Sequence, residues 1–576
     1  MKRWFKYMKP YLAYFILGPL CMIVEVIGEV IMPRLLAIII NRANDGLLTS
    51  GDSIGIMFLM ILTAVVMMAG GVGGAYFSAK ASVNFAADLR ADLYSRIQAF
   101  SFANIDKFST GSLVTRLTND VTQLQNFIAM VMRMALRAPG MMIAALVMAI
   151  MLNPPLSVVF AVSIPLMLIT LTFIISVGFG RFSKMQAKID GLNSNVQENV
   201  TNVRVVKSFV REEHSIKGFK KANKELKDAG VSAMSVMIFL QPIMTLFMNA
   251  TIIAVILIGG RIVLNNGMPV GNLSLFITYV TQILSSLLMI TFMLMMSSRA
   301  MASGKRIIEV LDEKLDISDE NASNPEKRVE NGEIEFRNVE FRYYKNSEDP
   351  VLSNINLKIP ANSIVGIIGS TGSGKSTLVS LIPRLYDCDE GEVLVDGVNV
   401  RDYSLVNLRD GIGMVLQKNT LFSGTIAENL RWGNEEATDE EVKEFASYAQ
   451  ADKFISTFTE GYETKLDQGG TNVSGGQKQR LCIARALLKR PKILILDDST
   501  SAVDTATEAQ IRKAFREELQ GSTKIIIAQR ISSVRDADMI IVLNEGRITG
   551  VGKHDELLRN NTEYREIYES QSGKEE

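Results

Sequence analysis

Six long apolar stretches occupy the first half of this chain, and they constrain its fold more than any other feature. They cover approximately residues 12–40, 54–78, 132–152, 156–179, 236–264 and 271–297. A helix needs about 20 apolar residues to cross a bilayer. Because unpaired backbone groups are costly in lipid, an apolar span of this kind crosses as a helix. The sequence therefore predicts an all-α transmembrane domain with six spans.

The N-terminal twenty residues combine basic and aromatic side chains with the beginning of the first apolar stretch. That stretch continues without a small-residue cleavage site and more spans follow it, so we do not interpret it as a signal peptide. Trp4, Tyr7 and Tyr11 suit a helix that lies at the membrane surface before the first span.

The gaps between the spans alternate in length and charge. The gaps near 41–53, 153–155 and 265–270 are short and carry few Lys or Arg, whereas those at 80–131 and 181–235 are long and basic. The positive-inside rule then places the long gaps and both termini in the cytoplasm. The long gaps lack Pro and carry regularly spaced apolar residues, which predicts helices that continue well past the bilayer.

Two carboxylates, Glu25 and Glu29, lie one helical turn apart inside the first span. A charge in hydrocarbon is costly, so both side chains should face protein or a water-filled cavity. They are candidates for a site that binds cationic substrates. The alternative is a structural pairing with Arg34, Arg133 or Arg137, and the sequence leaves both interpretations open.

Small and flexible residues recur in the same half. The methionine-rich stretches at 130–134 and 293–296 could form an adaptable pocket, although plain packing is the favoured explanation for them. The GGVGG run at 70–74 most simply allows two helices to approach closely.

An acidic, polar segment at 309–336 separates the apolar half from a charged, glycine-punctuated half. We place the transmembrane domain at 1–311, a linker at 312–332 and a second domain at 333–576. Strand-like pieces at 333–336 and 364–368, followed by helical sequence, predict that the second domain is α/β. The formal net charge of the chain is zero. Because a nucleic-acid-binding protein would show a basic surplus, nucleic acid is not an expected partner.

The sequence GSTGSGKST at 369–377 is a P-loop that follows the strand-like piece IVGII and precedes the apolar segment LVSLIPRLY, which should be a helix. Its glycines let backbone N–H groups curl around phosphate, Lys375 should reach the β- and γ-phosphates, and Ser376 should ligate Mg²⁺. The ATP-binding candidates here are Gly369, Ser370, Thr371, Gly372, Ser373, Gly374, Lys375, Ser376 and Thr377.

A second motif, NVSGGQ at 472–477, resembles the signature of ATP-binding cassette (ABC) proteins. Six spans with long helical extensions, followed by a cassette, resemble an ABC exporter half-transporter over nearly the whole chain. The resemblance implies that short turns within the extensions rest on the cassettes, near 103–110 and 211–217. The second turn is expected to reach the cassette of a partner subunit.

The resemblance also implies roles for individual residues. Tyr343 should stack on adenine, Gln417 in the Q-loop should contact Mg²⁺ and the attacking water, and Asp497 in the Walker B strand should serve the metal. Asp504 closes the D-loop SAVD at 501–504, at the dimer interface. The signature residues expected to clamp the γ-phosphate of ATP on the partner are Ser474, Gly475, Gly476 and Gln477.

Two positions depart from the family pattern at the catalytic end of the site. Asp498 stands where a catalytic glutamate is usual, and Gln529 stands where a switch histidine is usual. A carboxylate that is one methylene shorter is displaced by about an ångström, and such a displacement can cost about a hundredfold in rate. A glutamine can donate a hydrogen bond but cannot become positively charged. Gln468, six residues before the signature serine, is a further departure from a usual Glu.

Together these departures resemble the degenerate-site subunit of heterodimeric bacterial multidrug exporters. The resemblance implies ATP and Mg²⁺ as cofactors, a homologous half-transporter as partner, amphipathic drugs or lipids as substrates, and the bacterial plasma membrane as location. One alternative is a homodimeric exporter that hydrolyses ATP slowly with Asp498. Another is a regulatory module in which ATP binding gates a pathway without stoichiometric turnover.

Overall fold

The computed structural model of the chain describes residues 2–320, 322–344, 347, 349–498 and 504–572. Contacts divide the chain into two compact units. The first comprises Met1–Ile97 and Gly111–Asp312, and the second comprises Gln98–Thr110 and Glu313–Glu576.

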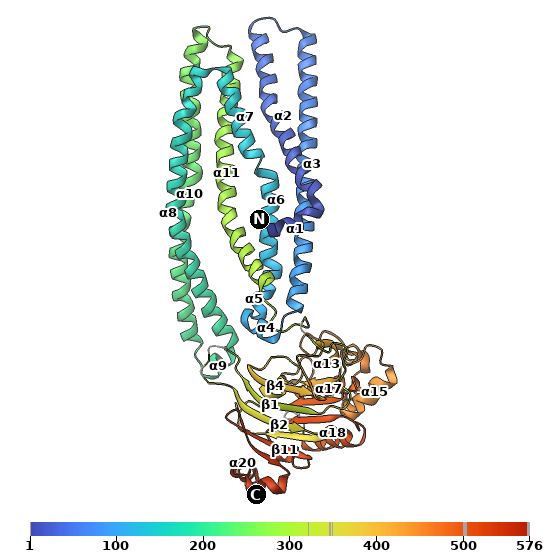
Figure 1. Cartoon of the computed structure of the whole chain (residues 1–576). Coiled ribbons are helices and arrows are strands. Elements are labelled where there is room, and N and C mark those ends of the chain that lie inside the picture. Colours follow the sequence, from blue (N-terminus) through green and yellow to red (C-terminus); the bar gives the residue numbers. More distant parts are fainter. Residues whose placement is uncertain (1, 321, 345–346, 348, 499–503, 573–576) are drawn as a thin grey trace. The chain divides into compact units, whose positions relative to one another are not determined.

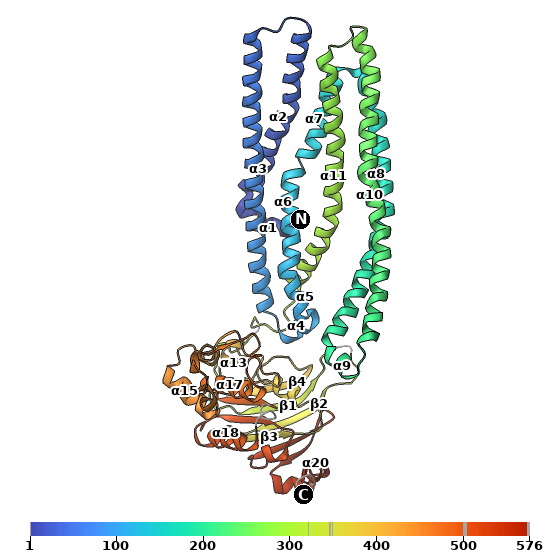
Figure 2. The same cartoon turned by 180° about the vertical axis from the view of Figure 1, so that it is seen from behind.

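The described residues of the first unit form helices joined by short turns and contain no strand, and Figure 1 and Figure 2 show its long helices running alongside one another. Six helical runs in the described residues are long and apolar enough to cross a membrane, which confirms the predicted number of spans. The helices of this unit are α1 (Lys2–Met8), α2 (Leu12–Asn44), α3 (Ser50–Gln98), α5 (Thr110–Thr115), α6 (Val121–Met134), α7 (Arg137–Leu152), α8 (Pro154–Thr201), α9 (Val203–Ser208), α10 (Glu212–Leu264) and α11 (Val270–Asp312), with short 3₁₀ and π turns at Lys9–Tyr11 and Arg116–Asp120.

The two long basic gaps are helical, as predicted. Helix α3 runs on to Gln98 and helix α8 to Thr201, far beyond their apolar parts. The turn predicted near 211–217 was misplaced, because α10 already begins at Glu212. The break lies at 202–211 instead and includes α9 and Val210, whose φ of 52° ends the regular backbone. No Gly or Pro marks that segment, so the sequence carried no breaker signal there.

The core of the first unit is apolar and includes closely packed aromatic rings. The rings of Phe160 on α8 and Phe276 on α11 stack at 5.3 Å, and both side chains are buried. Helices α2 and α3 approach closely at Gly70, where an added Cβ would lie 2.9 Å from the carbonyl oxygen of Cys21. The glycine run therefore serves close helix packing, as the sequence predicted.

The second unit is α/β. A six-stranded sheet has the order β12-β11-β3-β10-β9-β6, and a four-stranded antiparallel sheet has the order β2-β1-β4-β5. The strands are β1 (Ile334–Phe341), β2 (Leu352–Ile359), β3 (Ile364–Ile368), β4 (Glu390–Val395), β5 (Val398–Asn399), β6 (Ile412–Val415), β7 (Gly424–Thr425), β8 (Lys465–Leu466), β9 (Ile493–Asp497), β10 (Thr523–Ile527), β11 (Met539–Asn544) and β12 (Arg547–Gly552). The strand-like pieces predicted at 333–336 and 364–368 correspond to β1 and β3.

Short helices accompany these sheets. They are α4 (Phe102–Phe108), α12 (Lys375–Ser380), α13 (Leu405–Asp410), α14 (Ile426–Arg431), α15 (Asp439–Tyr448), α16 (Asp452–Ile455), α17 (Gly475–Leu488), α18 (Thr505–Glu517), α19 (His554–Asn560) and α20 (Thr562–Ser572), with 3₁₀ turns at Gly461–Glu463 and Ile531–Ser533. The helix expected over 378–386 is wrong in extent, because α12 ends at Ser380. Pro383 cannot donate to a continuing helix, and Arg384 adopts a φ of 51°.

Candidate functional site

Three neighbouring parallel strands end at one edge of the six-stranded sheet and define the site. Strand β10 pairs in parallel with both β3 and β9. The segments that leave their carboxyl ends therefore lie together: the P-loop after Ile368, Asp498 after Asp497, and Gln529 shortly after Ile527. In open α/β sheets, ligands bind outside this edge.

A cavity of about 340 Å³ opens at this edge, and its lining brings most of the predicted residues together. Its volume is within the range of small-molecule sites. The described lining residues are Tyr343, Val351, Thr371, Gly372, Ser373, Gly374, Lys375, Ser376, Thr377, Gln417, Asp497, Asp498, Ile527 and Gln529. Sequence reasoning did not single out Val351 and Ile527, because an apolar residue in a strand or at its start carries no chemical signal of its own.

The P-loop has the close turns that its glycines predicted. Gly369 and Ser370 are not among the described lining residues but begin the turn, and a Cβ on Gly369 would lie 1.9 Å from the carbonyl oxygen of Leu543. Gly374, with a φ of 95°, is the N-cap that immediately precedes α12. Only glycine allows this backbone path, and the loop's N–H groups can then approach phosphate.

Lys375 lies folded against the loop that carries it. Its ammonium group donates to the carbonyl oxygens of Gly369 (2.9 Å) and Ser370 (2.6 Å). Burial lowers the pKa of Lys375, and the nearby carboxylates of Asp498 and Asp497 oppose that shift. The side chain is thus a cation inside the cavity that anionic phosphates would stabilise.

Asp497 and Ser376 form the part of the site suited to a hard cation. The Ser376 hydroxyl donates to Asp497 Oδ1 at 2.9 Å, and Asp497 is only 4% exposed at the end of β9. Burial raises the pKa of the Asp497 carboxyl, an effect that Ser376 partly offsets. Mg²⁺ prefers oxygen ligands and few carboxylates, so these two side chains, with the amide oxygen of Gln417 in the same cavity lining, fit this ion.

Asp498 and Gln529, the two residues that depart from the family pattern, contact each other directly. Gln529 Nε2 donates to Asp498 Oδ2 at 2.7 Å. Asp498 has a left-handed φ of 47°, and its backbone N–H donates to the carbonyl oxygen of Ile527 at 3.2 Å. The sequence placed both residues at the catalytic end of the site, but their mutual hydrogen bond is a tertiary feature.

Tyr343, the predicted adenine platform, is 44% exposed and belongs to an aromatic cluster. Its hydroxyl shares a hydrogen bond of 3.0 Å with Thr377 Oγ1. Its ring packs edge-on against Tyr386 at 5.2 Å, and the Tyr386 hydroxyl donates to Asp106 of α4 at 3.0 Å. Burial and Asp106 raise the pKa of Tyr386. The tyrosine pair therefore connects the nucleotide cavity to α4, close to the turn predicted at 103–110.

The signature residues lie at the exposed beginning of α17 rather than in the described lining of the cavity. The Ser474 hydroxyl accepts from the Gln477 backbone N–H at 3.3 Å, while Gln477 Oε1 accepts from the Ser474 N–H at 2.9 Å. Gln477 is thus engaged in the helix cap, and Gly475 and Gly476 start the first turn. An uncovered helix N-terminus favours a negative charge, which suits a phosphate brought by another molecule.

The D-loop is described only in part. Ser501, Ala502 and Val503 lie outside the described residues, whereas Asp504 caps α18 by accepting from the Thr507 N–H at 3.0 Å. This bond lowers the pKa of Asp504 and keeps its carboxylate ionised at the start of the helix.

In the first unit, both membrane carboxylates pair with Arg137 at the start of α7. Its guanidinium lies 2.6 Å from Glu29 Oε1 and 3.2 Å from Glu25 Oε1. The structural pairing weighed from the sequence is therefore present, with Arg137 as the partner. A cavity of about 370 Å³ includes Glu29 and Arg137 in its lining, and its described methionines come from outside the two methionine-rich stretches.

Comparisons with known proteins agree with this architecture. The family model described as ABC transporter transmembrane region matches residues 15–287, and that described as ABC transporter matches residues 352–501. The uncharacterized ABC transporter ATP-binding protein YfiB of Bacillus subtilis is 38% identical, over 100% of this chain and 99% of its own length. The ATP-dependent lipid A-core flippase of Syntrophus aciditrophicus is 31% identical, over 99% and 94%.

A solved structure of a bacterial Atm1-family ABC exporter with ATP bound shares the fold, with a TM-score of 0.81 over 97% of this chain and 98% of that one. The sequence identity to that protein is 24%, so the likeness concerns the fold. This chain belongs to the ABC transporter family. It is an exporter-type half-transporter, in which a six-span membrane domain precedes an ATP-binding cassette.

Proposed function

We propose that this chain is the degenerate-site subunit of a heterodimeric ABC exporter in a bacterial plasma membrane, with both termini in the cytoplasm. Its own site binds ATP through the P-loop and Tyr343 but hydrolyses it poorly. Its signature residues complete the competent site, whose Walker motifs belong to the partner. The proposal divides the chain as the sequence predicted, into a transmembrane domain at 1–311, a linker at 312–332 and a cassette at 333–576.

The observation that carries the proposal is the Asp498–Gln529 pair. Hydrolysis requires a group that holds water in line with the γ-phosphate and charge that is stabilised as it develops. One oxygen of the Asp498 carboxylate accepts from the Gln529 amide at 2.7 Å, and that amide cannot become a cation. The site therefore holds the parts needed for binding, while those needed for turnover are weakened.

The remaining residues of the site support ATP binding. Ser376 and Asp497, with Gln417, would hold Mg²⁺, which when bound neutralises charge on the phosphate oxygens. Lys375 would exchange the carbonyl oxygens of Gly369 and Ser370 for phosphate oxygens. Asp504 would lie at the dimer interface, at the start of α18.

Amphipathic drugs or lipids are the substrates we propose. Similarity to a lipid A-core flippase supports a lipid-like substrate. Glu25 and Glu29 outnumber the single positive charge of Arg137, so a cationic group could be drawn to this side of the membrane cavity. Exposed apolar side chains around α9, including Phe209 at 73% and Val210 at 81%, suit contact with the partner's cassette.

The test is the steady-state ATPase rate of this chain purified alone in lipid, together with a search for a co-purifying half-transporter. We expect negligible turnover from the chain alone and recovery of activity when the partner is added. A rate of about 1 s⁻¹ lies at the lower end of typical enzyme turnover. If the chain alone reached that rate, the result would instead establish a homodimer that uses Asp498.

A further inference from the structure

The C-terminal helix α20 reaches residues 529–536, the segment after β10 that we call the switch segment, through the side chain of Gln571. Gln571 Nε2 donates to the carbonyl oxygen of Gln529 at 2.8 Å, and Gln571 Oε1 accepts from the backbone N–H of Ile531 at 2.9 Å. A side-chain amide offers both a donor and an acceptor, so one residue fixes the backbone on both sides of Arg530.

The opposite end of α20 is connected to the P-loop. Glu563 Oε1 accepts from Asn544 Nδ2 at 3.0 Å, and Asn544 Oδ1 accepts from the Ser370 hydroxyl at 3.3 Å. The two ends of one helix of eleven residues therefore contact, directly or through Asn544, the two loops that border the phosphate end of the cavity.

Helix α20 is firmly seated on the cassette. Tyr564 is fully buried, and its hydroxyl shares a hydrogen bond of 2.8 Å with His554 Nδ1. The backbone N–H of Tyr564 also donates to Asn561 Oδ1 at 2.7 Å. A helix fixed in this way can hold Gln571 at a defined place instead of following the motion of the switch segment.

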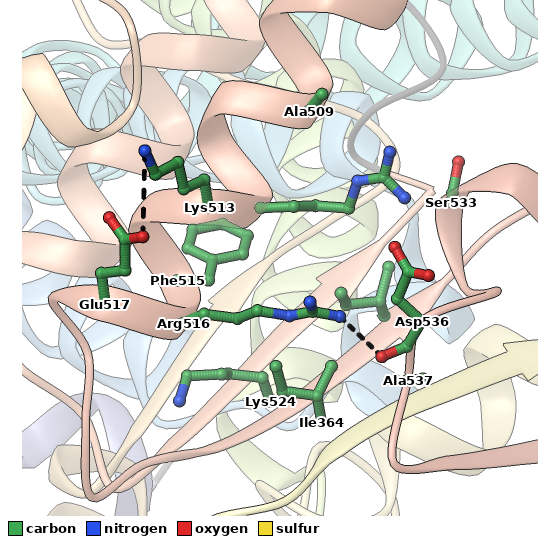
Figure 3. A pocket seen from close by; sticks show the side chains of 12 residues that line it. Ile364, Ala509, Lys513, Phe515, Arg516, Glu517, Lys524, Ser533, Asp536 and Ala537 are labelled. Carbon is green, nitrogen blue, oxygen red and sulfur yellow. Dashed lines mark hydrogen bonds and ion pairs between the residues drawn. The ribbon is translucent and has the colours of Figure 1, made fainter. Parts of the chain in front are cut away.

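Helix α18 holds the residues that come later in the same segment. Arg512 donates to the carbonyl oxygen of Ser532 at 2.5 Å, and Arg516 donates to that of Asp536 at 2.6 Å. Arg516 helps to line a pocket of about 260 Å³ that also contains Arg512, Lys513 and Lys524. Figure 3 shows Arg516 extending through this pocket to its bond with Asp536. These contacts begin at Ser532, and the Ala528 N–H donates to the carbonyl oxygen of Ile367 at the end of β10. Between these two points, Gln571 is the side chain that holds the Gln529 carbonyl in the part of the chain that the structure describes.

We propose that Gln571 is a positioning residue for Gln529. By fixing the backbone of Gln529, it holds the side-chain amide of Gln529 against Asp498 in the cavity. The C-terminal helix thereby tunes how tightly this chain's own site holds the γ-phosphate of ATP. The inference requires only an ATP site in this chain, so it stands in a heterodimer or in a homodimer.

The experiment measures ATP affinity at this chain's own site in the full transporter in lipid, by photolabelling this chain with 8-azido-ATP. Gln571→Leu should weaken labelling affinity by about threefold to tenfold, the size of one ordinary hydrogen bond. Gln571→Glu can accept from the Ile531 N–H but cannot donate to the Gln529 carbonyl. Its ATP affinity should therefore lie between those of the unchanged chain and Gln571→Leu. Glu566→Gln, an exposed change on the same helix, is the matched control and should leave affinity unchanged.

A double-mutant cycle separates positioning from a general effect on stability. Gln529→Ala removes the side chain but keeps the backbone that Gln571 holds. Gln571→Leu should therefore have no further effect on affinity in the Gln529→Ala background. Additive effects, or an unchanged affinity in Gln571→Leu, would overturn the proposal. A chain ending at Ser570 gives a second variant if Gln571→Leu does not fold, and neither result depends on the ATPase rate that tests the proposed function.

Discussion

Gln529 donates a hydrogen bond of 2.7 Å to the carboxylate of Asp498, so the two residues that depart from the family pattern form one unit. The amide therefore engages one oxygen of the carboxylate that would have to orient the attacking water. We therefore expect their effects on hydrolysis to be coupled rather than independent.

Replacing Asp498 and Gln529 by the glutamate and histidine that are usual in the family should raise the rate of ATP hydrolysis at this site. Asp498→Glu lengthens the carboxylate by one methylene, and Gln529→His supplies a group that can carry positive charge. We expect the double variant to raise the ATPase rate by about tenfold to a hundredfold, and either single variant to raise it less. The measurement is steady-state ATPase in lipid. Adding Lys375→Ala to the double variant is the control, since the gain should vanish with the loss of phosphate binding.

Ser474→Ala should impair the partner's site while leaving this chain's own ATP affinity intact. The serine hydroxyl lies at the exposed N-terminus of α17, outside the described lining of this chain's cavity. Loss of one phosphate-stabilising donor typically costs about a hundredfold in rate, and we expect a fall of that order in the transporter's ATPase rate.

Ser474→Ala also removes the N-cap of α17, so the control variant must remove a helix N-cap as well. Thr438 caps α15 with the same reciprocal arrangement, through Glu441. Thr438→Ala should therefore lose similar stability, about 1 kcal/mol, without the loss of turnover. Equal ATPase rates in the two variants would contradict the role proposed for Ser474.

Tyr386→Phe should reduce the stimulation of ATPase by substrate and spare ATP binding. The change removes only the hydroxyl that donates to Asp106 of α4, while the ring can still pack against Tyr343. The readout is the ratio of substrate-stimulated to basal ATPase. Tyr448→Phe removes a comparable tyrosine–carboxylate bond, to Glu444, and should leave that ratio unchanged.

Acidification should destabilise the cassette through His554. Burial lowers the pKa of this histidine below the ordinary 6.5, with a smaller contribution from Arg535 and opposition from Asp555 and Asp536. The unfolded chain therefore takes up the proton first, and the free energy of unfolding falls as the pH drops below about 6.5. His554→Gln should flatten this pH dependence of Tm. His214→Gln, at an exposed site in the first unit, should not.

Arg137→Met should destabilise the transmembrane domain more than removal of the whole charged cluster. The single change leaves Glu25 and Glu29 without their shared partner, at about 2–3 kcal/mol for each charge at membrane depth. The triple variant with Glu25→Gln and Glu29→Gln removes the charges together and should recover most of the lost stability. Thermal unfolding in detergent compares the two, and a triple variant less stable than the single one would contradict this account.

Much of the fold followed from local sequence alone. The length of the apolar stretches predicted the six spans, because backbone N–H and C=O groups in lipid must be hydrogen-bonded within a helix. The spacing of apolar side chains predicted the helical extensions. The turn at 202–211 was predicted a few residues too late in the chain, near 211–217, because no Gly or Pro marks its position. The helix after the P-loop was predicted too long, although Pro383 was visible in the sequence.

For the site, the sequence determined which residues could handle phosphate, because glycine, lysine and hydroxyl groups at fixed spacing have a defined chemistry. Only the tertiary structure decided how distant residues pair. The contacts of Asp498 with Gln529, of Glu25 and Glu29 with Arg137, and of Gln571 with the switch segment join residues between 31 and 112 positions apart. A hydrogen bond or ion pair depends on distance and direction in space, and these are set by the packing of whole strands and helices rather than by neighbours in the sequence.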